Sequence, residues 1–252
     1  MTYVMSDIHG NMRRFESVMK QIDLQPEDTL YVLGDVIDRY PDGIRILRRL
    51  IKMPNVQMLL GNHEYMMLNA IGYEYLKDND KKRKLRFGQM ALWYHNGGEV
   101  THNYIKHIRK ETRAEIFNYL IDLPVNIDVE VNGLKFKLVH GAPKEIYAYY
   151  KWDYHNPIEC AVWHRLDDND VDFDGFTIIF GHTPTEYFQE CTPMSIWYSE
   201  DKKKIGIDCG CGYPSQGKNY SDNPMITRLG CLRLDDMKEF YSEEPEGEEK
   251  DG

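Results

Sequence analysis

The chain has 252 residues, of which 42% are hydrophobic and 29% charged, and this ordinary globular balance excludes wholesale disorder. Its formal net charge is −10, which argues against a nucleic-acid-binding groove, because such a groove needs a basic face. No apolar run approaches the roughly 18 residues of a membrane-spanning helix, and residues 1–7 lack the basic and apolar stretches of a signal peptide.

Acidic residues are concentrated at the end of the chain. Residues 243–252 contain six acidic residues and one lysine, and we predict that they form a solvated, disordered tail. No internal repeat and no linker rich in Pro, Gly or Ser divides the remainder, so we predict one domain over residues 1–242. The five cysteines are an odd number in a chain too long to need disulfides, so we expect reduced thiols and a cytoplasmic location.

Five short apolar runs each end abruptly at polar residues that can bind a metal or a phosphate. Each run has the length and the β-branched or aromatic content of a buried strand. The runs cover residues 3–5, 30–33, 56–60, 136–139 and 178–180, and they lead into Asp7 and His9, Asp35 with Asp38 and Arg39, Asn62 and His63, His140, and His182. We therefore expect the catalytic and ligand-binding residues to lie at the ends of the strands.

The spacing of the first three runs predicts parallel strands joined by helices. Residues 15–22 and 44–51, between the runs, carry apolar side chains at helical spacing. Asp7 and Asp35 are 28 residues apart and Asp35 and Asn62 are 27 apart, each about one strand-helix-strand unit. Because such crossovers leave the strands parallel, their carboxyl ends share one edge of the sheet, where ligands bind in open α/β folds. These three side chains should therefore converge there.

The rest of the chain is less regular. Residues 65–120 are mostly helical in composition, with an interruption at residues 96–98. The remaining segments with strand composition are residues 125–131, 134–139, 205–207 and 229–234. The first two flank Asn132-Gly133, a strong hairpin signal.

Six side chains at the strand ends are potential metal ligands: Asp7, His9, Asp35, Asn62, His140 and His182. Carboxylates, imidazoles and an amide oxygen without a thiolate suit divalent manganese, iron or zinc. These ligands are too many for a structural zinc, which takes about four. They suit two ions about 3.5–4 Å apart that share a carboxylate, an arrangement that supports displacement at phosphorus.

The order of the motifs resembles that of a known family. Asp-x-His-Gly, Gly-Asp-x-x-Asp-Arg, Gly-Asn-His-Glu, His-Gly and Gly-His-Thr follow one another over residues 7–183 and resemble the calcineurin-like metallophosphoesterases. The Asp38-Arg39 pair makes the chain more similar to the phosphoprotein phosphatase branch, which includes bacterial and lambda-phosphatase-like serine/threonine phosphatases. The resemblance implies an α/β fold, a four-layer α/β/β/α sandwich with a dinuclear metal site at the carboxyl ends of the strands.

The resemblance also implies how the metal ligands are shared. They would be Asp7, His9 and His182 for one ion, Asn62 and His140 for the other, and Asp35 as the bridge. We expect two divalent ions, manganese first, with iron or zinc as alternatives. A hydroxide bridging the ions would be the nucleophile, so no covalent enzyme intermediate is expected.

The resemblance implies roles in the handling of the substrate for five residues. His63 would be the general acid that protonates the leaving oxygen, with Asp38 orienting its imidazole. Arg39 would bind phosphoryl oxygens, since a planar guanidinium matches phosphate geometry, and Asn62 would also contact the substrate. Arg165 would be the second phosphate-binding arginine, because it lies two residues after a tryptophan and 25 after the first His-Gly motif.

One position departs from the family pattern. The residue after Asp-Arg is usually glycine, whereas here it is Tyr40. If the backbone there needs a positive φ, a tyrosine is costly. Otherwise we expect Tyr40 to line the rim of the pocket and change the shape of substrate that it accepts.

Two other clusters have simpler explanations than function. Cys209-Gly210-Cys211 is predicted to be a buried turn with unreactive thiols, because a lone Cys-x-Cys is a weak metal signal. The basic run over residues 81–86 is predicted to be a solvated face rather than a docking site for an acidic partner.

These observations favour a metal-dependent phosphomonoester hydrolase, in the first place a serine/threonine protein phosphatase. The alternative enzyme is a diadenosine tetraphosphate hydrolase, which should carry an aromatic slot with polar edges near the metals. An alternative of another class is an inactive module that binds phosphopeptides, although the sequence lacks none of the ligands and keeps the acid. The expected partner is a phosphorylated protein or a small phosphorylated substrate, without nucleic acid or membrane.

Overall fold

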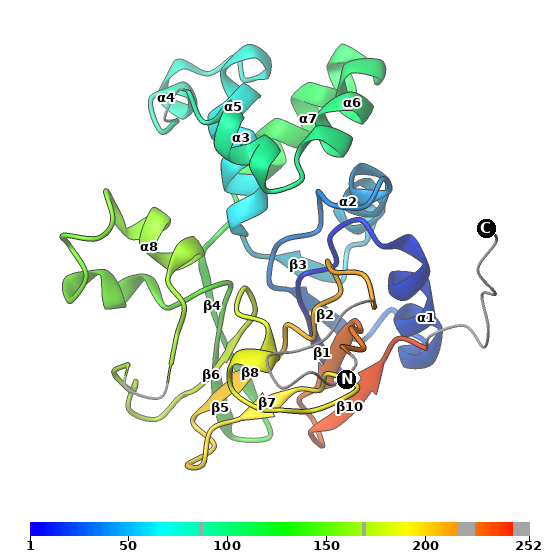
Figure 1. The fold of residues 1–252 in the computed structure, drawn as a ribbon, viewed down its shortest axis with the longest axis vertical. Helices are drawn as coiled ribbons and strands as arrows, with labels where there is room; N and C mark the ends of the chain where they lie inside the picture. The colour runs from blue at the N-terminus through cyan, green and yellow to red at the C-terminus, as the bar shows by residue number, and fades with distance from the viewer. Residues whose placement is uncertain (86–87, 168–169, 216–224, 244–252) are drawn as a thin grey trace.

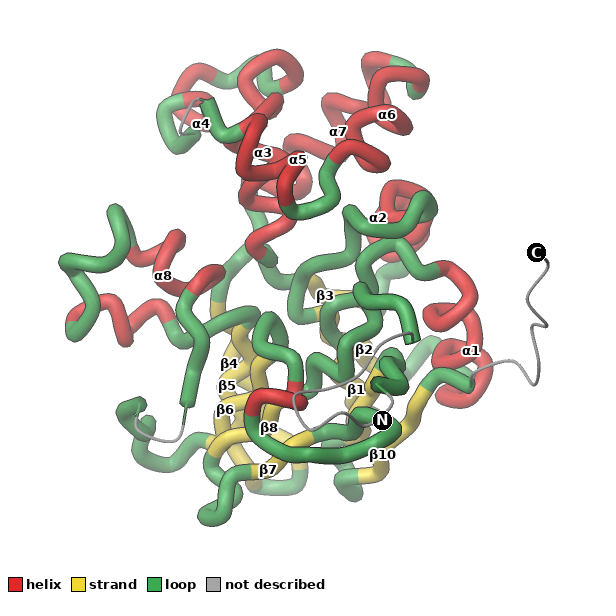
Figure 2. Tube along the Cα trace, viewed as in Figure 1, coloured by secondary structure: helices red, strands yellow, loops and turns green. Residues whose placement is uncertain are grey.

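The computed structural model describes residues 1–85, 88–167, 170–215 and 225–243 (Figure 1). The predicted acidic tail over 243–252 lies outside these residues except for Glu243. Two five-stranded sheets form the centre of the molecule, and helices lie around them (Figure 2).

The first sheet is built from the strand-helix-strand units that the spacing predicted. Strands β1 (Thr2–Met5), β2 (Thr29–Val32) and β3 (Val56–Met58) are parallel neighbours. Helices α1 (Met12–Ile22) and α2 (Gly43–Lys52) connect them. Strands β9 (Gly230–Arg233) and β10 (Lys238–Tyr241) add antiparallel to the other edge of β1, giving the order β10-β9-β1-β2-β3.

The second sheet begins with the predicted hairpin. Strands β4 (Asn126–Val131) and β5 (Leu134–Val139) are antiparallel and turn at Asn132-Gly133, where φ is positive at both residues, as the tight turn of a hairpin requires. Strand β6 (Thr177–Phe180) pairs parallel with β5, and β8 (Lys204–Gly206) pairs parallel with β6. Strand β7 (Trp197–Tyr198) completes the order β4-β5-β6-β8-β7.

Alternation of side chains along the strands stacks the two sheets. On β1, Val4 packs with Leu138 of β5 and Ile179 of β6 in a core between the sheets. Its neighbour Met5 instead packs with Phe15 on α1. Side chains on the outer face of β6 pack under a short 3-10 helix η1 (Lys144–Ala148) and helix α8 (Pro157–Trp163). The layers are therefore helix, sheet, sheet, helix, which confirms the predicted sandwich.

A helical lobe inserts between β3 and β4 (Figure 1, upper part). It contains helices α3 (Asn62–Tyr75), α4 (Asn79–Lys82), α5 (Met90–His95), α6 (Glu99–His107) and α7 (Lys110–Ile121). The prediction of a mostly helical segment is confirmed, and the interruption at 96–98 is the corner between α5 and α6. In the described part of the chain, no helix is both long and apolar enough to cross a membrane.

Candidate active site

The polar residues that follow the strands of both sheets meet at one rim. The first sheet contributes residues after β1, β2 and β3, and the second contributes residues after β5 and β6. All seven side chains are at most 7% exposed: Asp7, His9, Asp35, Asn62, His63, His140 and His182. Backbone hydrogen bonds hold the rim, such as Gly181 N–H to the carbonyl of His140 at 2.9 Å. The spacing argument thus located the convergence correctly.

The backbone at this rim is unusual. Four of the candidate ligands adopt left-handed backbone conformations, namely Asp7, His9, Asp35 and His182, with φ values of 56°, 49°, 54° and 62°. Non-glycine residues with positive φ are uncommon and concentrate at functional sites. The sharp bends at the strand ends are therefore further evidence that this rim is built for ligand binding.

Ring and carboxylate atoms of the rim form two groups that share Asp35. One group contains Asp35, His9 and His63, and the other contains Asp35, His140 and His182, with ligand atoms within 4.8 Å of one another in each group. His9 Nε2 lies 3.7 Å from Asp35 Oδ2, and His140 Nε2 lies 3.5 Å from Asp35 Oδ1. The carboxylate of Asp35 thus faces both groups with different oxygens.

The ring of His182 is on a different side of Asp35 than the sequence implied. We expected His182 to share an ion with Asp7 and His9, but its imidazole lies against that of His140, with ring centroids 5.1 Å apart. The reason is the strand order, because β6 is the parallel neighbour of β5 in the second sheet. Only the backbone N–H of His182 reaches Asp7, at 3.0 Å from Oδ2.

Each of the three histidines that are candidate ligands, His9, His140 and His182, has a ring nitrogen on a backbone carbonyl. His9 Nδ1 lies 3.2 Å from the carbonyl of Ile37, and His140 Nδ1 lies 2.7 Å from that of Leu33. A neutral imidazole that donates from Nδ1 keeps Nε2 as a lone-pair donor for a metal. His182 uses its Nε2 on a carbonyl at 3.2 Å, which leaves Nδ1 for a ligand.

The protonation states of the buried groups at the rim favour the binding of divalent cations. Burial raises the pKa of Asp35, and the nearby carboxylates of Asp7 and Glu64 raise it further. Burial lowers the pKa of His9 and of His182 well below the usual value, so these imidazoles are neutral at pH 7. Buried carboxylates beside neutral imidazoles are a donor set that divalent metal ions fit.

A buried carboxylate missed by the sequence interpretation supports this rim. Glu64 is fully buried, and its carboxylate accepts the backbone N–H groups of Asp35 and Val36, both at 2.9 Å, and of Gly61 at 3.2 Å. It thereby fixes the turn after β2 to the start of α3. The signal was the last letter of Gly-Asn-His-Glu, to which we had given no role.

His63 and Asp38 form a buried pair beside the candidate ligands. His63 Nδ1 lies 2.7 Å from Asp38 Oδ2, and the two side chains are 1% and 0% exposed. The backbone N–H of His63 donates to Asp35 Oδ1 at 2.9 Å, which ties the pair to the shared carboxylate. His63 Nε2 lies 3.8 Å from Asp35 Oδ2, so this nitrogen faces the rim.

Two arginines border the rim, one in the turn after β2 and the other in the segment after α8. Arg39 Nη2 lies 3.5 Å from His63 Nε2, and its guanidinium stacks 4.4 Å above the ring of Tyr213. Arg165 Nη1 donates to the carbonyl of His182 at 3.0 Å. Tyr213 was missed, because it arrives on a loop after β8 and no sequence signal marks it. Binding of phosphate by the two arginines stays a prediction.

The backbone conformation at Tyr40 shows whether a tyrosine is strained at this position. Positive φ values occur at the two preceding residues, Asp38 and Arg39, at 71° and 66°, and not at Tyr40. A tyrosine at this position therefore carries no left-handed strain. Its N–H donates to the carbonyl of His9 at 3.1 Å, which keeps the segment against the rim.

A hollow of about 420 Å³ adjoins the rim beside Arg165. Its lining residues come from the segment after α8, from the residues after His182 and from β7: Arg165, Leu166, Asp167, Thr183, Tyr187, Phe188 and Trp197. Tyr187, in the 3-10 helix η2 (Thr185–Tyr187), has its ring 5.8 Å from the Arg165 guanidinium. This slot is lined by three aromatic rings, with an arginine and an aspartate as polar edges, and the rings of Phe188 and Trp197 stack on each other with centroids 4.3 Å apart.

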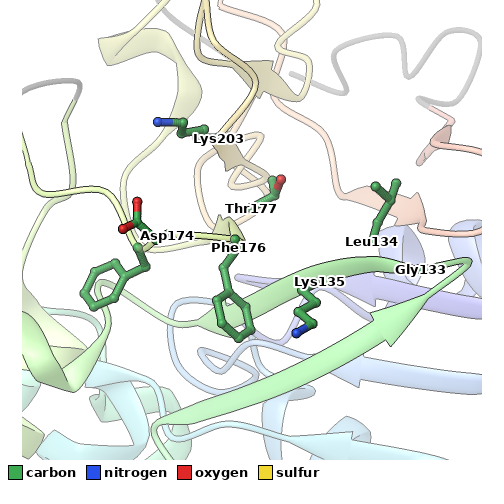
Figure 3. Close-up of a pocket in the computed structure, with 9 residues that line it drawn as sticks. Gly133, Leu134, Lys135, Asp174, Phe176, Thr177 and Lys203 are labelled. Atoms are coloured by element: carbon green, nitrogen blue, oxygen red, sulfur yellow. The ribbon is translucent and has the colours of Figure 1, made fainter.

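Another hollow, of about 260 Å³, lies at the opposite edge of the second sheet (Figure 3). It is bordered by Lys135 at the start of β5, by Phe176 before β6 and by Lys203 before β8. None of its lining residues belongs to the candidate ligands. Since it lies at the amino ends of the parallel strands, it is separate from the candidate active site.

The Cys209-Gly210-Cys211 turn and the basic run over residues 81–86 make ordinary buried and surface contacts in their described parts. Cys209 and Cys211 are free and buried, and burial raises the pKa of Cys211 to about 12, as expected of unreactive thiols. In the basic run, Lys81 pairs with Asp122 and Arg83 pairs with Asp80 at 2.7 Å, while residue 86 lies outside the described residues.

The comparisons with known proteins agree with this geometry. A family model described as calcineurin-like phosphoesterase matches residues 2–205, so the chain belongs to the calcineurin-like phosphoesterase family. This confirms the resemblance found in the motifs, and with it the metallophosphoesterase fold.

Curated relatives carry two different names. A symmetrical bis(5'-nucleosyl)-tetraphosphatase from Haemophilus ducreyi is 24% identical over 78% of this chain and 63% of its own length. A serine/threonine-protein phosphatase 2 from Salmonella typhimurium is 29% identical over 73% of this chain and 80% of its own length. The chain spans less than two thirds of the first nucleotide hydrolases that it matches, only 30% for the one from Pectobacterium atrosepticum.

Solved structures share the fold at low sequence identity. A putative diadenosine tetraphosphatase superposes with a TM-score of 0.58 at 16% identity and covers 95% of this chain and 91% of its own. A cold-active protein-tyrosine phosphatase from Shewanella superposes with a TM-score of 0.55 at 14% identity, covering 96% of this chain and 80% of its own. These likenesses establish the fold and leave the substrate open.

Proposed function

We propose that the chain is a metal-dependent phosphoester hydrolase that uses two divalent ions. The observation that carries this proposal is the buried cluster of carboxylates and neutral imidazoles around Asp35, flanked by the His63–Asp38 pair. One ion would be held by Asp7, His9 and Asp35, and the other by Asp35 with Asn62, His140 and His182. When bound, the two ions supply positive charge to the phosphoryl oxygens and to the attacking water.

The residues of the chain itself place the substrate and move a proton. Arg39 and Arg165 bind phosphoryl oxygens from two sides of the rim, since each planar guanidinium can donate two parallel hydrogen bonds. His63 delivers the proton at Nε2 to the leaving oxygen, because Asp38 holds the proton on Nδ1 and so fixes the ring orientation. Asn62 contacts the phosphoryl group from the metal side.

The substrate that we propose first is a protein phosphorylated on serine or threonine, hydrolysed with manganese as the preferred metal and iron or zinc as alternatives. The Asp38-Arg39 pair and the relative named serine/threonine-protein phosphatase 2, matched over 80% of its length, support this choice. Two arginines at the rim suit a phosphate presented on a larger molecule, because each guanidinium can bind phosphoryl oxygens.

A second candidate is favoured by one specific observation. A diadenosine tetraphosphate hydrolase was expected to carry an aromatic slot with polar edges near the metals, and the hollow beside Arg165 has this character. Stacking of a base on an aromatic ring contributes about 1–3 kcal/mol. The relative named symmetrical bis(5'-nucleosyl)-tetraphosphatase supports the same candidate function.

A direct comparison of kcat/KM separates the two candidates. Protein stripped with a chelator and reloaded with manganese is assayed on a phosphothreonine peptide and on diadenosine tetraphosphate, with His63→Asn protein as the background control. Dominant peptide turnover supports the protein phosphatase, and dominant nucleotide turnover supports the nucleotide hydrolase. If wild-type protein equals the control on both substrates while it binds metal, both substrate proposals are wrong.

A further inference from the structure

We propose that Trp93, on helix α5 of the helical lobe, is a positioning residue for His63 and acts through Asp38. The inference rests on the proposed function in one respect, the role of His63 as general acid. It assigns to the lobe a part in catalysis, although the candidate metal ligands other than Asn62 lie outside the lobe.

Two hydrogen bonds converge on one oxygen of Asp38. The indole Nε1–H of Trp93 donates to Asp38 Oδ2 at 2.8 Å, and His63 Nδ1 lies 2.7 Å from the same oxygen. Trp93 and Asp38 are both 0% exposed, so this hydrogen bond is shielded from bulk solvent. The carboxylate is thus fixed between the two rings, and the angle at which His63 meets the substrate depends on both contacts.

The same corner of the lobe also holds the backbone of Asp38 and Arg39. The N–H of Asp38 donates to Thr101 Oγ1 on α6 at 3.0 Å, and the N–H of Arg39 donates to the carbonyl of Gly97 at 3.1 Å. Both residues have positive φ, a conformation that persists only where the surroundings enforce it. Three contacts from α5, the corner and α6 therefore support the acid pair and the phosphate-binding arginine together.

The two glycines of the corner make this approach possible. A Cβ atom at Gly98 would lie 2.3 Å from Trp93 Nε1, closer than any packing allows. Gly97 has a φ of 89°, and a Cβ atom there would crowd Arg39 at 3.1 Å. The two glycines are thus explained by close contacts, of Gly97 with Arg39 and of Gly98 with the indole of Trp93.

The consequence is a specific kinetic signature. A general acid matters when the leaving oxygen is a poor leaving group and matters little when it departs readily as an anion. Loosening Asp38 should therefore slow the hydrolysis of phenyl phosphate more than that of 2,4-dinitrophenyl phosphate. A role of Trp93 in packing alone would slow both substrates equally.

The variant that tests this is Trp93→Phe, which keeps an aromatic ring and removes the N–H donor. We expect kcat for phenyl phosphate to fall about tenfold, the size expected from one lost hydrogen bond to a charged acceptor, with less than about twofold change for 2,4-dinitrophenyl phosphate. Trp152→Phe is the matched control, because Trp152 is 98% exposed, and it should change neither rate. Equal losses on both substrates in Trp93→Phe would overturn the proposal.

His63→Asn separates this inference from the proposed function. A larger loss on phenyl phosphate than on the dinitrophenyl ester in His63→Asn, without such a difference in Trp93→Phe, refutes the role of Trp93 alone. Equal losses in His63→Asn refute the proposed acid itself.

A measurement without turnover covers the case in which Trp93→Phe does not fold. In protein with ¹⁵N-labelled tryptophan, we expect the indole N–H of Trp93 to be protected from solvent exchange and its resonance to move in Asp38→Asn. The indole resonance of Trp152 should stay unchanged. A Trp93 resonance that does not respond to Asp38→Asn would show that the hydrogen bond is absent.

Discussion

At the scale of single residues, the site separates metal binding from proton transfer. His63 lies among the candidate ligands, close enough to Asp35 for the two side chains to share an ion. Its Nδ1 is paired with Asp38, however, and we propose that His63 protonates the leaving oxygen and does not bind an ion. Under this assignment, replacing His63 removes a proton donor, whereas replacing a ligand removes metal.

His63→Asn should therefore keep both ions and lose turnover. Asparagine has no proton to deliver at the position of Nε2, so kcat on an alkyl phosphate such as a phosphothreonine peptide should fall by about 10²–10⁴-fold. The metal content of the purified variant, measured by elemental analysis, should equal that of wild type. A variant that has lost one ion would show that His63 is a ligand, and an unchanged kcat would exclude it as the acid.

At the scale of elements, the slot beside Arg165 depends on the short helix η2. Tyr187 is 57% exposed there, and its ring lies 5.8 Å from the guanidinium of Arg165, the proposed second phosphate-binding arginine. Tyr187→Ala should raise KM for diadenosine tetraphosphate about tenfold, as expected from a lost base stack, with less than about twofold change for a phosphopeptide. Tyr149→Ala, at another exposed tyrosine, serves as the control. Equal effects on the two substrates would mean that the slot holds no base.

Another element-scale contact fastens the segment between α8 and β6. Asp170 accepts hydrogen bonds from Tyr150 at 2.7 Å, from His164 at 3.1 Å and from the N–H of Asp167 at 3.0 Å. Burial raises the pKa of Asp170, but these hydrogen bonds outweigh it and leave the pKa below the usual value. The buried His164 thus has a structural partner and takes no part in the ligand set.

Because this pKa is lower in the folded state, the stability that Asp170 contributes is present above its unfolded pKa of about 4 and is lost as the pH falls through the folded pKa. At pH 7, Asp170→Asn should lower the free energy of unfolding by about 1–3 kcal/mol. Urea unfolding at pH 7 and at pH 3 should show the difference from wild type shrinking at the lower pH. Asp153→Asn, at an exposed carboxylate before α8, should show little difference at either pH.

Much of this arrangement could be predicted from the sequence, for a physical reason. A parallel strand-helix-strand unit has a nearly fixed length, so the spacing between Asp7, Asp35 and Asn62 placed their strand ends on one edge. The side of Asp35 on which His182 lies could not be predicted, because it depends on the strand order of the second sheet. Trp93 and Tyr213 reach the site from a distant lobe and loop, and no local pattern marks such contacts.

At the scale of the whole molecule, the candidate metal site joins the two sheets. Asp7, His9, Asp35 and Asn62 follow strands of the first sheet, whereas His140 and His182 follow strands of the second. Ions bound at this rim would link the sheets as well as supply chemistry. Binding to the folded state alone stabilises a protein by about 2.7 kcal/mol at a ligand concentration one hundred times the dissociation constant.

Asp35→Asn should separate these two contributions with opposite signs. Without metal, burial raises the pKa of Asp35, so an ionised carboxylate there is a cost that asparagine removes, and the variant should have a higher Tm than metal-free wild type. With manganese, wild type should gain several degrees while the variant gains little, because the shared ligand is gone. Thermal unfolding with and without chelator measures both changes, and His107→Ala, at an exposed histidine, should follow wild type in each. A manganese-dependent rise in Tm that persists in Asp35→Asn would contradict a carboxylate shared between two ions.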